Sequence, residues 1–414
     1  MIQLKSDFNY HMQIRINKFS YHYLGKGNLG QTPAFSSVVR SHLSQYKTME
    51  CNGTNDLSDL VLLYTKDDFT YNTSNSHKQE VSSGFDTLLK RGWEAAMEAG
   101  IFNYKVDNVE TKIIPGKYHI VAQMNANRFK LRRKPDEIVS VVQPFDPKKF
   151  NFTKIKNEEI LMNLHYGLSN EEEEKVPQDL KYDLEATLLI NNAPICYGHS
   201  LLVPFLDECR PQVLDYESLI IGIHSVLLSN TPNYRLAFNS LCGYASVNHL
   251  HFHLYYLPHR LYLEDAECEL LAGPCYVFKD YHSPGFVFFL KDGAIEELAR
   301  NLMKITKMFI EKGVAHNMFV TRGVSPNGNI KGDTFDTIRV VVWARKPAYG
   351  IKDVSVFAPA VCELAGHVPV YSPAHWENLK EEDFTKVVNL VSEETFQAFK
   401  PKVAELFSTS EPST

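Results

Sequence analysis

The sequence lacks the features that mark several specialised classes of protein. It contains no run of about 18 consecutive apolar residues, so a transmembrane helix is not expected. Its first residues include no apolar segment like that of a secretory signal, so export is not expected either. Lys and Arg number 43 against 49 Asp and Glu, which gives a formal charge of −6. Without an excess of basic residues, neither nucleic acid nor a membrane surface is expected as a partner.

The sequence lacks paired cysteine motifs. The seven cysteines are scattered without a CxxC pair, and their number is odd. This distribution argues against both a disulfide framework and a zinc finger, and it favours free thiols in a reducing compartment. We therefore expect a cytoplasmic protein.

The order of strand and helix patterns predicts an α+β protein in two halves, residues 1–265 and 266–414. Each half is expected to contain an antiparallel sheet flanked by helices. The expected strands include 234–241 and 248–257 in the first half, and 315–321 and 337–344 in the second. Asp215 is expected to cap a helix, and the last helical pattern, 381–406, is expected to break near Pro401.

Three histidines alternate along one expected strand. Because side chains of a strand point to opposite faces in turn, His249, His251 and His253 share one face, while Leu250, Phe252 and Leu254 (the other face) anchor the strand. Burying three imidazoles is costly unless each has a partner. The pattern therefore indicates a functional site.

Two chemistries fit three imidazoles in line. The first is a zinc site shared by His249 and His251, but His253 lies too far along the strand, and no nearby Cys or carboxylate supplies a further ligand. The second is a row of imidazoles along a phosphate chain, in which one neutral ring is the nucleophile and its neighbours bind phosphate oxygens. We favour the second, and no metal or cofactor is expected.

Residues before the triplet are candidates for the same site. Ser246 ends a turn that could bring a hydroxyl to the phosphate, and Asn239, on the preceding strand, could add an amide. Charge alone makes four further residues candidates for neutralising phosphate: Lys148, Lys149, Arg322 and Lys331.

Two other patterns are interpreted as having no functional role. The glycines of 25–30, GKGNLG, match a dinucleotide-binding fingerprint, but no buried strand follows, so we expect a turn. The basic cluster 128–134, RFKLRRK, is expected to be a solvated loop, although it could face an anionic substrate.

The motif HLHFHLYY at 249–256 resembles that of the histidine triad (HIT) superfamily. The surrounding sequence is similar to the animal branch of its GDP-hexose phosphorylases. The similar stretches are 144–154 (PFDPKKFNFTK), 197–204 (YGHSLLVP), 235–240 (RLAFNS), 245–249 (ASVNH), 315–323 (AHNMFVTRG), 342–346 (VWARK) and 362–367 (CELAGH).

This resemblance implies two HIT-like halves and a nucleotidyltransferase. His251 would attack the α-phosphorus of GDP-D-glucose to give a covalent GMP-histidine and release glucose 1-phosphate; inorganic phosphate would then convert the intermediate to GDP. His249 and His253 would orient His251 and bind phosphate oxygens, and Ser246 matches a phosphate-binding serine of related transferases.

Other readings stay open at this point. A HIT-type nucleotide hydrolase is one, because a histidine at position 253 is also the hydrolase pattern. A dinucleotide phosphorylase and a non-catalytic guanine-nucleotide-binding protein are the others. The sequence leaves the oligomeric state open, with a homodimer as one candidate.

Overall fold

The computed structural model describes residues 13–16, 60–74, 82–106, 109–134, 136–167, 184–326, 328, 334–349 and 357–408. The glycine-rich stretch 25–30 and Lys331 lie outside these residues, so the predictions made for them have no structural counterpart.

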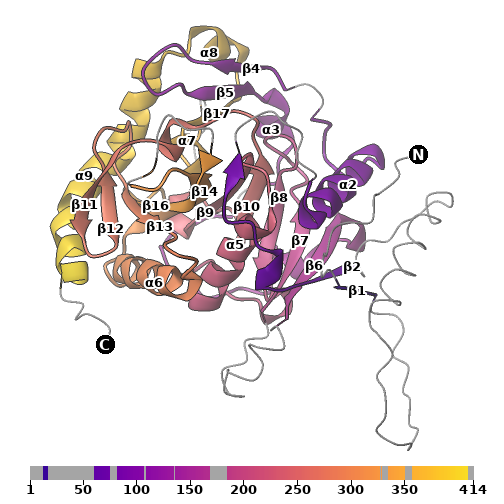
Figure 1. Ribbon diagram of the computed structural model, residues 1–414. Helices are drawn as coiled ribbons and strands as arrows, with labels where there is room; N and C mark the ends of the chain where they lie inside the picture. The colour runs from indigo at the N-terminus through magenta and orange to yellow at the C-terminus, as the bar shows by residue number, and fades with distance from the viewer. Residues whose placement is uncertain are drawn as a thin grey trace, which may run out of the picture.

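A twelve-stranded sheet forms the centre of the described structure (Figure 1). Its strands follow the order β1-β2-β6-β7-β8-β10-β9-β14-β16-β13-β12-β11, and among these β2 and β6 alone pair in parallel. In chain order the strands are β1 (Gln13–Ile16), β2 (Leu60–Tyr64), β6 (Ile160–Tyr166), β7 (Glu185–Ile190), β8 (Ser200–Pro204), β9 (Tyr234–Asn239), β10 (Phe252–Tyr256), β11 (Cys268–Ala272), β12 (Cys275–Phe278), β13 (Phe286–Phe289), β14 (Ala315–Gly323) and β16 (Thr337–Arg345).

The sheet is continuous across the two predicted halves. Strand β9 of the first half pairs antiparallel with β14 of the second, with Asn239 opposite Asn317. The predicted α+β architecture of antiparallel strands flanked by helices is confirmed, and the sheets of the two halves join into one. The division at residue 265 stays a prediction.

Three amphipathic or buried helices cover one face of the central sheet: α2 (Gly84–Glu98), α5 (Tyr216–Leu228) and α6 (Ile295–Glu311). Alternate strand residues such as Leu236 and Phe238 pack in the same core as these helices. The predicted cap of α5 is confirmed, because the Asp215 carboxylate accepts the main-chain N–H of Ser218 at 2.8 Å.

The other face is covered by a small sheet and short helices, opposite α5 and α6 (Figure 1). Strand β5 pairs in parallel with β17 and antiparallel with β4. The elements here are α3 (Ala126–Leu131), β4 (Thr111–Ile113), β5 (Val121–Met124), α7 (Val361–Leu364), β17 (His367–Val370) and α8 (Pro373–Asn378). A further pair joins β3 (Thr73–Ser74) to β15 (Thr334–Phe335).

The last helix differs from its prediction. Helix α9 (Glu381–Ser408) continues through Pro401, so the break expected there is wrong. Pro401 is exposed, whereas Phe399 and Val403 on either side are buried in the core. Proline cannot donate a main-chain hydrogen bond. Burial of the face that contains Phe399 and Val403 stabilises the helix where that bond is missing. Of the described helices, α9 included, none has the length and apolar character needed to cross a membrane.

The strand that carries the histidines also begins later than predicted. Strand β10 starts at Phe252, not near Asn248. The main-chain N–H groups of Leu250 and His251 donate to Arg210 O and Gln212 Oε1 instead of to a neighbouring strand. Residues 249–251 therefore lie beyond the end of the β-ladder, against the segment that precedes α5.

Candidate active site

The three predicted histidines come together at the end of β10. His253 lies in the strand and pairs with Ala237 of β9 and Leu201 of β8. His251 and His249 precede the strand, and the ring centroids of His251 and His253 are 5.1 Å apart. His249 and His251 are buried, whereas His253 is partly exposed.

The hydrogen bond of His251 leaves one ring nitrogen available as a nucleophile. Its Nδ1 lies 2.7 Å from the main-chain oxygen of His249. Because a carbonyl oxygen can accept but not donate, the hydrogen of the neutral ring is on Nδ1. Nε2 then carries a lone pair, and it has no hydrogen bond to any residue that the structure describes. An imidazole in this tautomer can attack an electrophilic phosphorus.

A fourth histidine fixes the tautomer of His253. The N–H of Ile195 donates to Nδ1 of His199 at 2.8 Å, so the hydrogen of that ring is on Nε2. The same Nε2 lies 3.1 Å from Nδ1 of His253 and 3.3 Å from the amide nitrogen of Asn191. An amide nitrogen only donates, so His253 Nδ1 is the acceptor. His253 therefore carries its hydrogen on Nε2 and can donate to a phosphate oxygen.

His249 sits at the other end of the row, between aromatic rings. The N–H of Phe152 donates to its Nδ1 at 3.1 Å, and the rings of Phe145 and Phe152 lie 5.5 and 5.4 Å from its ring centroid. The hydrogen of His249 is therefore on Nε2. These contacts fix the ring of His249. The main-chain oxygen of the same residue accepts the hydrogen bond from His251.

Burial keeps the row neutral at physiological pH. It lowers the pKa of His249 and of His251 to about 4, and for His251 the hydrogen bond to the His249 carbonyl opposes this shift. Burial also lowers the pKa of His253 and of His199 well below the usual value, and the neighbouring imidazoles and Arg128 lower it further. A neutral His251 retains the lone pair that nucleophilic attack requires.

The basic cluster 128–134 begins within α3, so the predicted loop is wrong for residues 128–131, although Lys130 and Lys134 are exposed as expected. Two of its arginines lie beside the row, and the alternative that the cluster faces an anionic substrate stays a prediction. Arg128 donates to the oxygen of Ala193, two residues before the N–H that holds His199. At the other end, Arg133 Nη2 donates to the oxygen of Ser246 at 2.8 Å. Two half-buried guanidinium groups thus flank the row of imidazoles. They can neutralise a phosphate chain lying along it.

The other two predicted site residues are placed differently. Ser246 is half-buried, three residues before His249, and its hydroxyl has no hydrogen bond within the described part of the chain. Asn239 lies at the end of β9, but its side-chain oxygen accepts from Asn317 Nδ2 at 2.6 Å and Val361 N at 3.1 Å. Its role in binding phosphate stays a prediction.

Of the cations chosen by charge alone, Arg322 is placed away from the row of imidazoles, whereas a role for Lys148 and Lys149 stays a prediction. Arg322 is buried elsewhere, where it donates to the carbonyls of Thr70, Val226 and Ser229, so its predicted role is wrong. Lys148 and Lys149 are exposed. No cluster of three or more His, Cys, Asp or Glu among the described residues has a geometry that could hold a metal ion.

Sequence reasoning missed His199 and underrated Arg128 and Arg133. Within the stretch 197–204, which was noted for its similarity to a family, Gly198 adopts a left-handed φ of 69°. A Cβ there would lie 2.5 Å from the Tyr256 ring, so glycine is required. The signal for His199 was a histidine at the start of a strand, but its contact with His253 depends on the pairing of β8 with β10.

Comparisons with known proteins found matches over most of the chain. Two models of the GDPGP1-like family match the chain: the N-terminal domain at residues 84–255 and the C-terminal domain at 274–410. GDP-D-glucose phosphorylase 1 of Danio rerio is 38% identical over 81% of this chain and 96% of its own length. The human protein of the same name is 41% identical over 72% of this chain and 77% of its own.

More distant proteins share the sequence pattern or the fold. GDP-L-galactose phosphorylase 2 of Arabidopsis thaliana is 30% identical over 75% of this chain and 74% of its own length. The crystal structure of yeast Ap4A phosphorylase Apa2 matches 76% of this chain and 95% of that chain with a TM-score of 0.50 and 14% identity. The latter likeness concerns the fold alone.

Proposed function

Because the chain belongs to the GDPGP1-like family, we propose that it catalyses the phosphorolysis of GDP-D-glucose to GDP and D-glucose 1-phosphate. The chain is an enzyme of the GDP-hexose phosphorylase type, which transfers a nucleotidyl group. The observation that carries the proposal is the hydrogen bond from His251 Nδ1 to His249 O, which leaves Nε2 as a nucleophile.

The proposed reaction has two in-line displacements. In the first, the Nε2 lone pair of His251 forms a bond to the α-phosphorus, and the bond from that phosphorus to the bridging oxygen breaks, so that glucose 1-phosphate leaves with the electron pair. In the second, an oxygen of inorganic phosphate attacks the same phosphorus, the P–N bond breaks, and GDP leaves. His251 regains its lone pair, and no proton needs to leave Nδ1.

The neighbours of His251 supply orientation and charge stabilisation. The carbonyl of His249 accepts from Nδ1–H and favours the positive charge that the ring acquires once Nε2 is bonded to phosphorus. Nε2–H of His253 would donate to an oxygen of the transferred group, and Arg128 and Arg133 would offset the charge of the phosphates. Ser246 would add a hydroxyl at the Arg133 end of the row.

A product assay tests the proposal. With GDP-glucose as substrate, we expect release of GDP and glucose 1-phosphate in proportion to added phosphate. Release of GMP in phosphate-free buffer at a comparable rate would indicate a hydrolase instead. Faster turnover of a dinucleoside polyphosphate would indicate a dinucleotide phosphorylase, and tight binding without turnover a binding protein.

The compartment and the assembly are further proposals. A cytoplasmic location is supported by the six described cysteines, which are all free thiols. A homodimer stays a prediction, and sedimentation velocity of the purified protein measures it.

A further inference from the structure

The main chain of His251 is held by a side chain rather than by a strand. His251 N donates to Oε1 of Gln212 at 2.9 Å, and Gln212 Nε2 donates to His251 O at 3.1 Å. The same Nε2 donates to Asn239 O, at the end of β9, at 2.9 Å. One buried carboxamide therefore replaces the strand pairing that β10 has lost at this point, and it joins His251 to the central sheet.

The segment that contains Arg210 and Gln212 lies alongside residues 248–251, which carry the first two histidines. The Gln212 main-chain N–H donates to the side-chain oxygen of Asn248 at 2.9 Å. Arg210 O accepts the N–H of Leu250 at 2.8 Å. Residues 248, 250 and 251 thus each bond to residue 210 or 212. The place of the His251 ring depends on where this segment lies.

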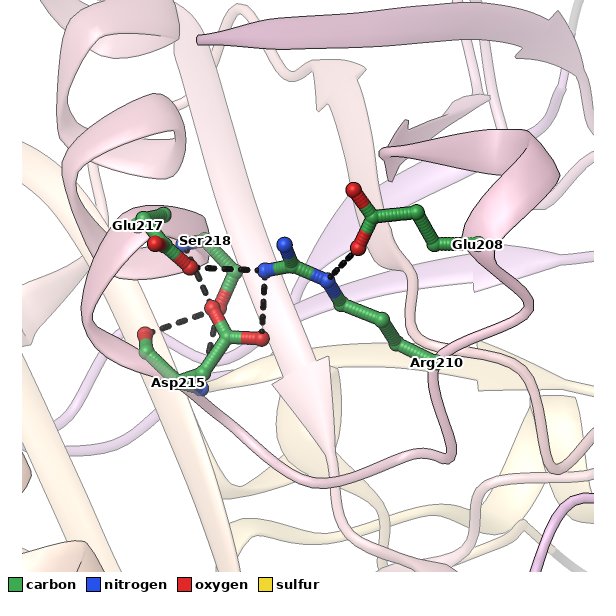
Figure 2. Close-up of polar contacts among 5 residues, drawn as sticks. All are labelled: Glu208, Arg210, Asp215, Glu217 and Ser218. Carbon is green, nitrogen blue, oxygen red and sulfur yellow. Dashed lines mark hydrogen bonds and ion pairs between the residues drawn. The ribbon is translucent and has the colours of Figure 1, made fainter. Parts of the chain in front are cut away.

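Ion pairs fix that segment to its surroundings (Figure 2). Arg210 Nε donates to Glu208 at 2.7 Å, and Nη1 donates to Asp215 at 2.9 Å and to Glu217 at 2.8 Å. Asp215 is also the cap of α5, so Arg210 ties the segment to the start of a helix whose residues are buried in the core. The guanidinium also lies 3.8 Å from the centroid of the Phe205 ring.

The backbone of this segment is strained. Phe205 and Cys209, on either side of the short helix Leu206–Glu208, have φ values of 47° and 54°. Residues other than glycine rarely adopt this left-handed conformation, and it persists where the surrounding structure imposes it. The strain is an independent sign that the path of the chain here is specified closely.

We propose that Gln212 is a positioning residue for His251. Its carboxamide fixes the peptide groups on both sides of His251, so that Nε2 faces the substrate while Nδ1 stays on the His249 carbonyl. Arg210 holds the segment that presents Gln212. This inference rests on the proposed function, because it requires His251 to be the nucleophile.

Two substitutions at Gln212 test the proposal. Gln212→Met keeps the length of the side chain but removes all three hydrogen bonds, and Gln212→Glu keeps an acceptor for His251 N–H. We expect the rate of GMP transfer to the enzyme, measured in single turnovers without phosphate, to fall about a hundredfold in the first variant and less in the second. The KM for GDP-glucose should change less than about threefold, because neither variant removes a contact with the substrate.

Gln123 provides a matched control. It is also buried, and its side chain bonds to Thr111 at 3.1 Å and to His367 at 2.7 Å, but it lies in the small sheet. Gln123→Met should lower the melting temperature without changing the transfer rate. Arg210→Met should lower that rate by a smaller factor than Gln212→Met, because it acts through the segment.

The outcomes separate the two proposals. If the wild-type enzyme forms no GMP adduct, the proposed function fails. If it does, and Gln212→Met transfers GMP at the wild-type rate or loses rate only in proportion to unfolded protein, the positioning role is wrong. A rise in KM with an unchanged rate would also contradict it.

Discussion

His251 and His316 are two buried histidines with the same local arrangement and different surroundings. In each, Nδ1 faces the carbonyl of the residue two positions earlier, at 2.7 Å for His251 and 3.3 Å for His316. Burial lowers the pKa of both to about 4. Both rings therefore have the tautomer that can act as a nucleophile.

The neighbours distinguish the two rings. His316 lies between the rings of Phe238 and Phe309, each with its centroid 5.9 Å away, and its Nε2 is buried without a hydrogen-bond partner in the described structure. His251 stands in a row of imidazoles flanked by two arginines. The comparison teaches that a lone pair on Nε2 is not enough. A site also needs donors and positive charge that can receive a phosphate.

The largest expected difference is between the variants in which these two histidines are replaced in turn. His251→Ala should lower turnover of GDP-glucose by at least about four orders of magnitude, because the nucleophile is lost. His316→Ala should keep most of the activity per folded molecule and lower the free energy of unfolding by about 1–3 kcal/mol. Steady-state kinetics and chemical denaturation of both variants measure this. Equal losses of activity would break the comparison.

A smaller effect is expected at His199, which acts through His253. His199→Phe removes the donor to Nδ1 of His253 and frees that ring to hold its hydrogen on either nitrogen. The rate of GMP transfer should fall about a hundredfold, because His253 would no longer be held ready to donate to the charge that develops on the phosphate oxygens. His224→Phe is the control, since His224, a residue of α5, is buried against the rings of Tyr64 and Phe69. A similar loss of rate in both variants would argue against the role of His199 in fixing the tautomer of His253.

The smallest expected effect is the change of the transfer rate with pH. Because the pKa of His251 is about 4, the transfer rate should be nearly constant from pH 7 to about 5 and fall as pH falls through 4. Unfolded histidines have a pKa near 6.5, so the unfolded chain binds more protons below that pH. Stability should therefore decrease as pH falls from about 6.5 toward 4, to which His249, His251 and His316 all contribute. A rate that already falls below pH 7 while the protein stays folded would contradict the low pKa.

The sequence predicts the parts of the site that depend on local pattern. Alternation predicted that His249, His251 and His253 come together, although only His253 lies within β10. The Asp215 cap and the pairing of β9 with β10 followed from local signals. These features depend on residues close together in the chain, where period and capping chemistry decide the structure.

The remaining parts depend on contacts between distant segments. His199 meets His253 because β8 pairs with β10, and Gln212 meets His251 because the strand ends early. Nor does the sequence show that Arg322 turns into the core while Arg133 reaches the Ser246 turn. Charge and residue type do not specify such placements, since tertiary packing decides which side chains face the site.

The most direct test of the central claim is the intact mass of the protein after mixing with GDP-glucose in phosphate-free buffer. The account predicts a mass gain equal to one GMP group, mapped to His251 by peptide sequencing and reversed by adding phosphate. His251→Ala should show no gain, while His375→Ala, at an exposed position in α8, should show the full gain. An adduct on another residue, or normal turnover by His251→Ala, would contradict the account.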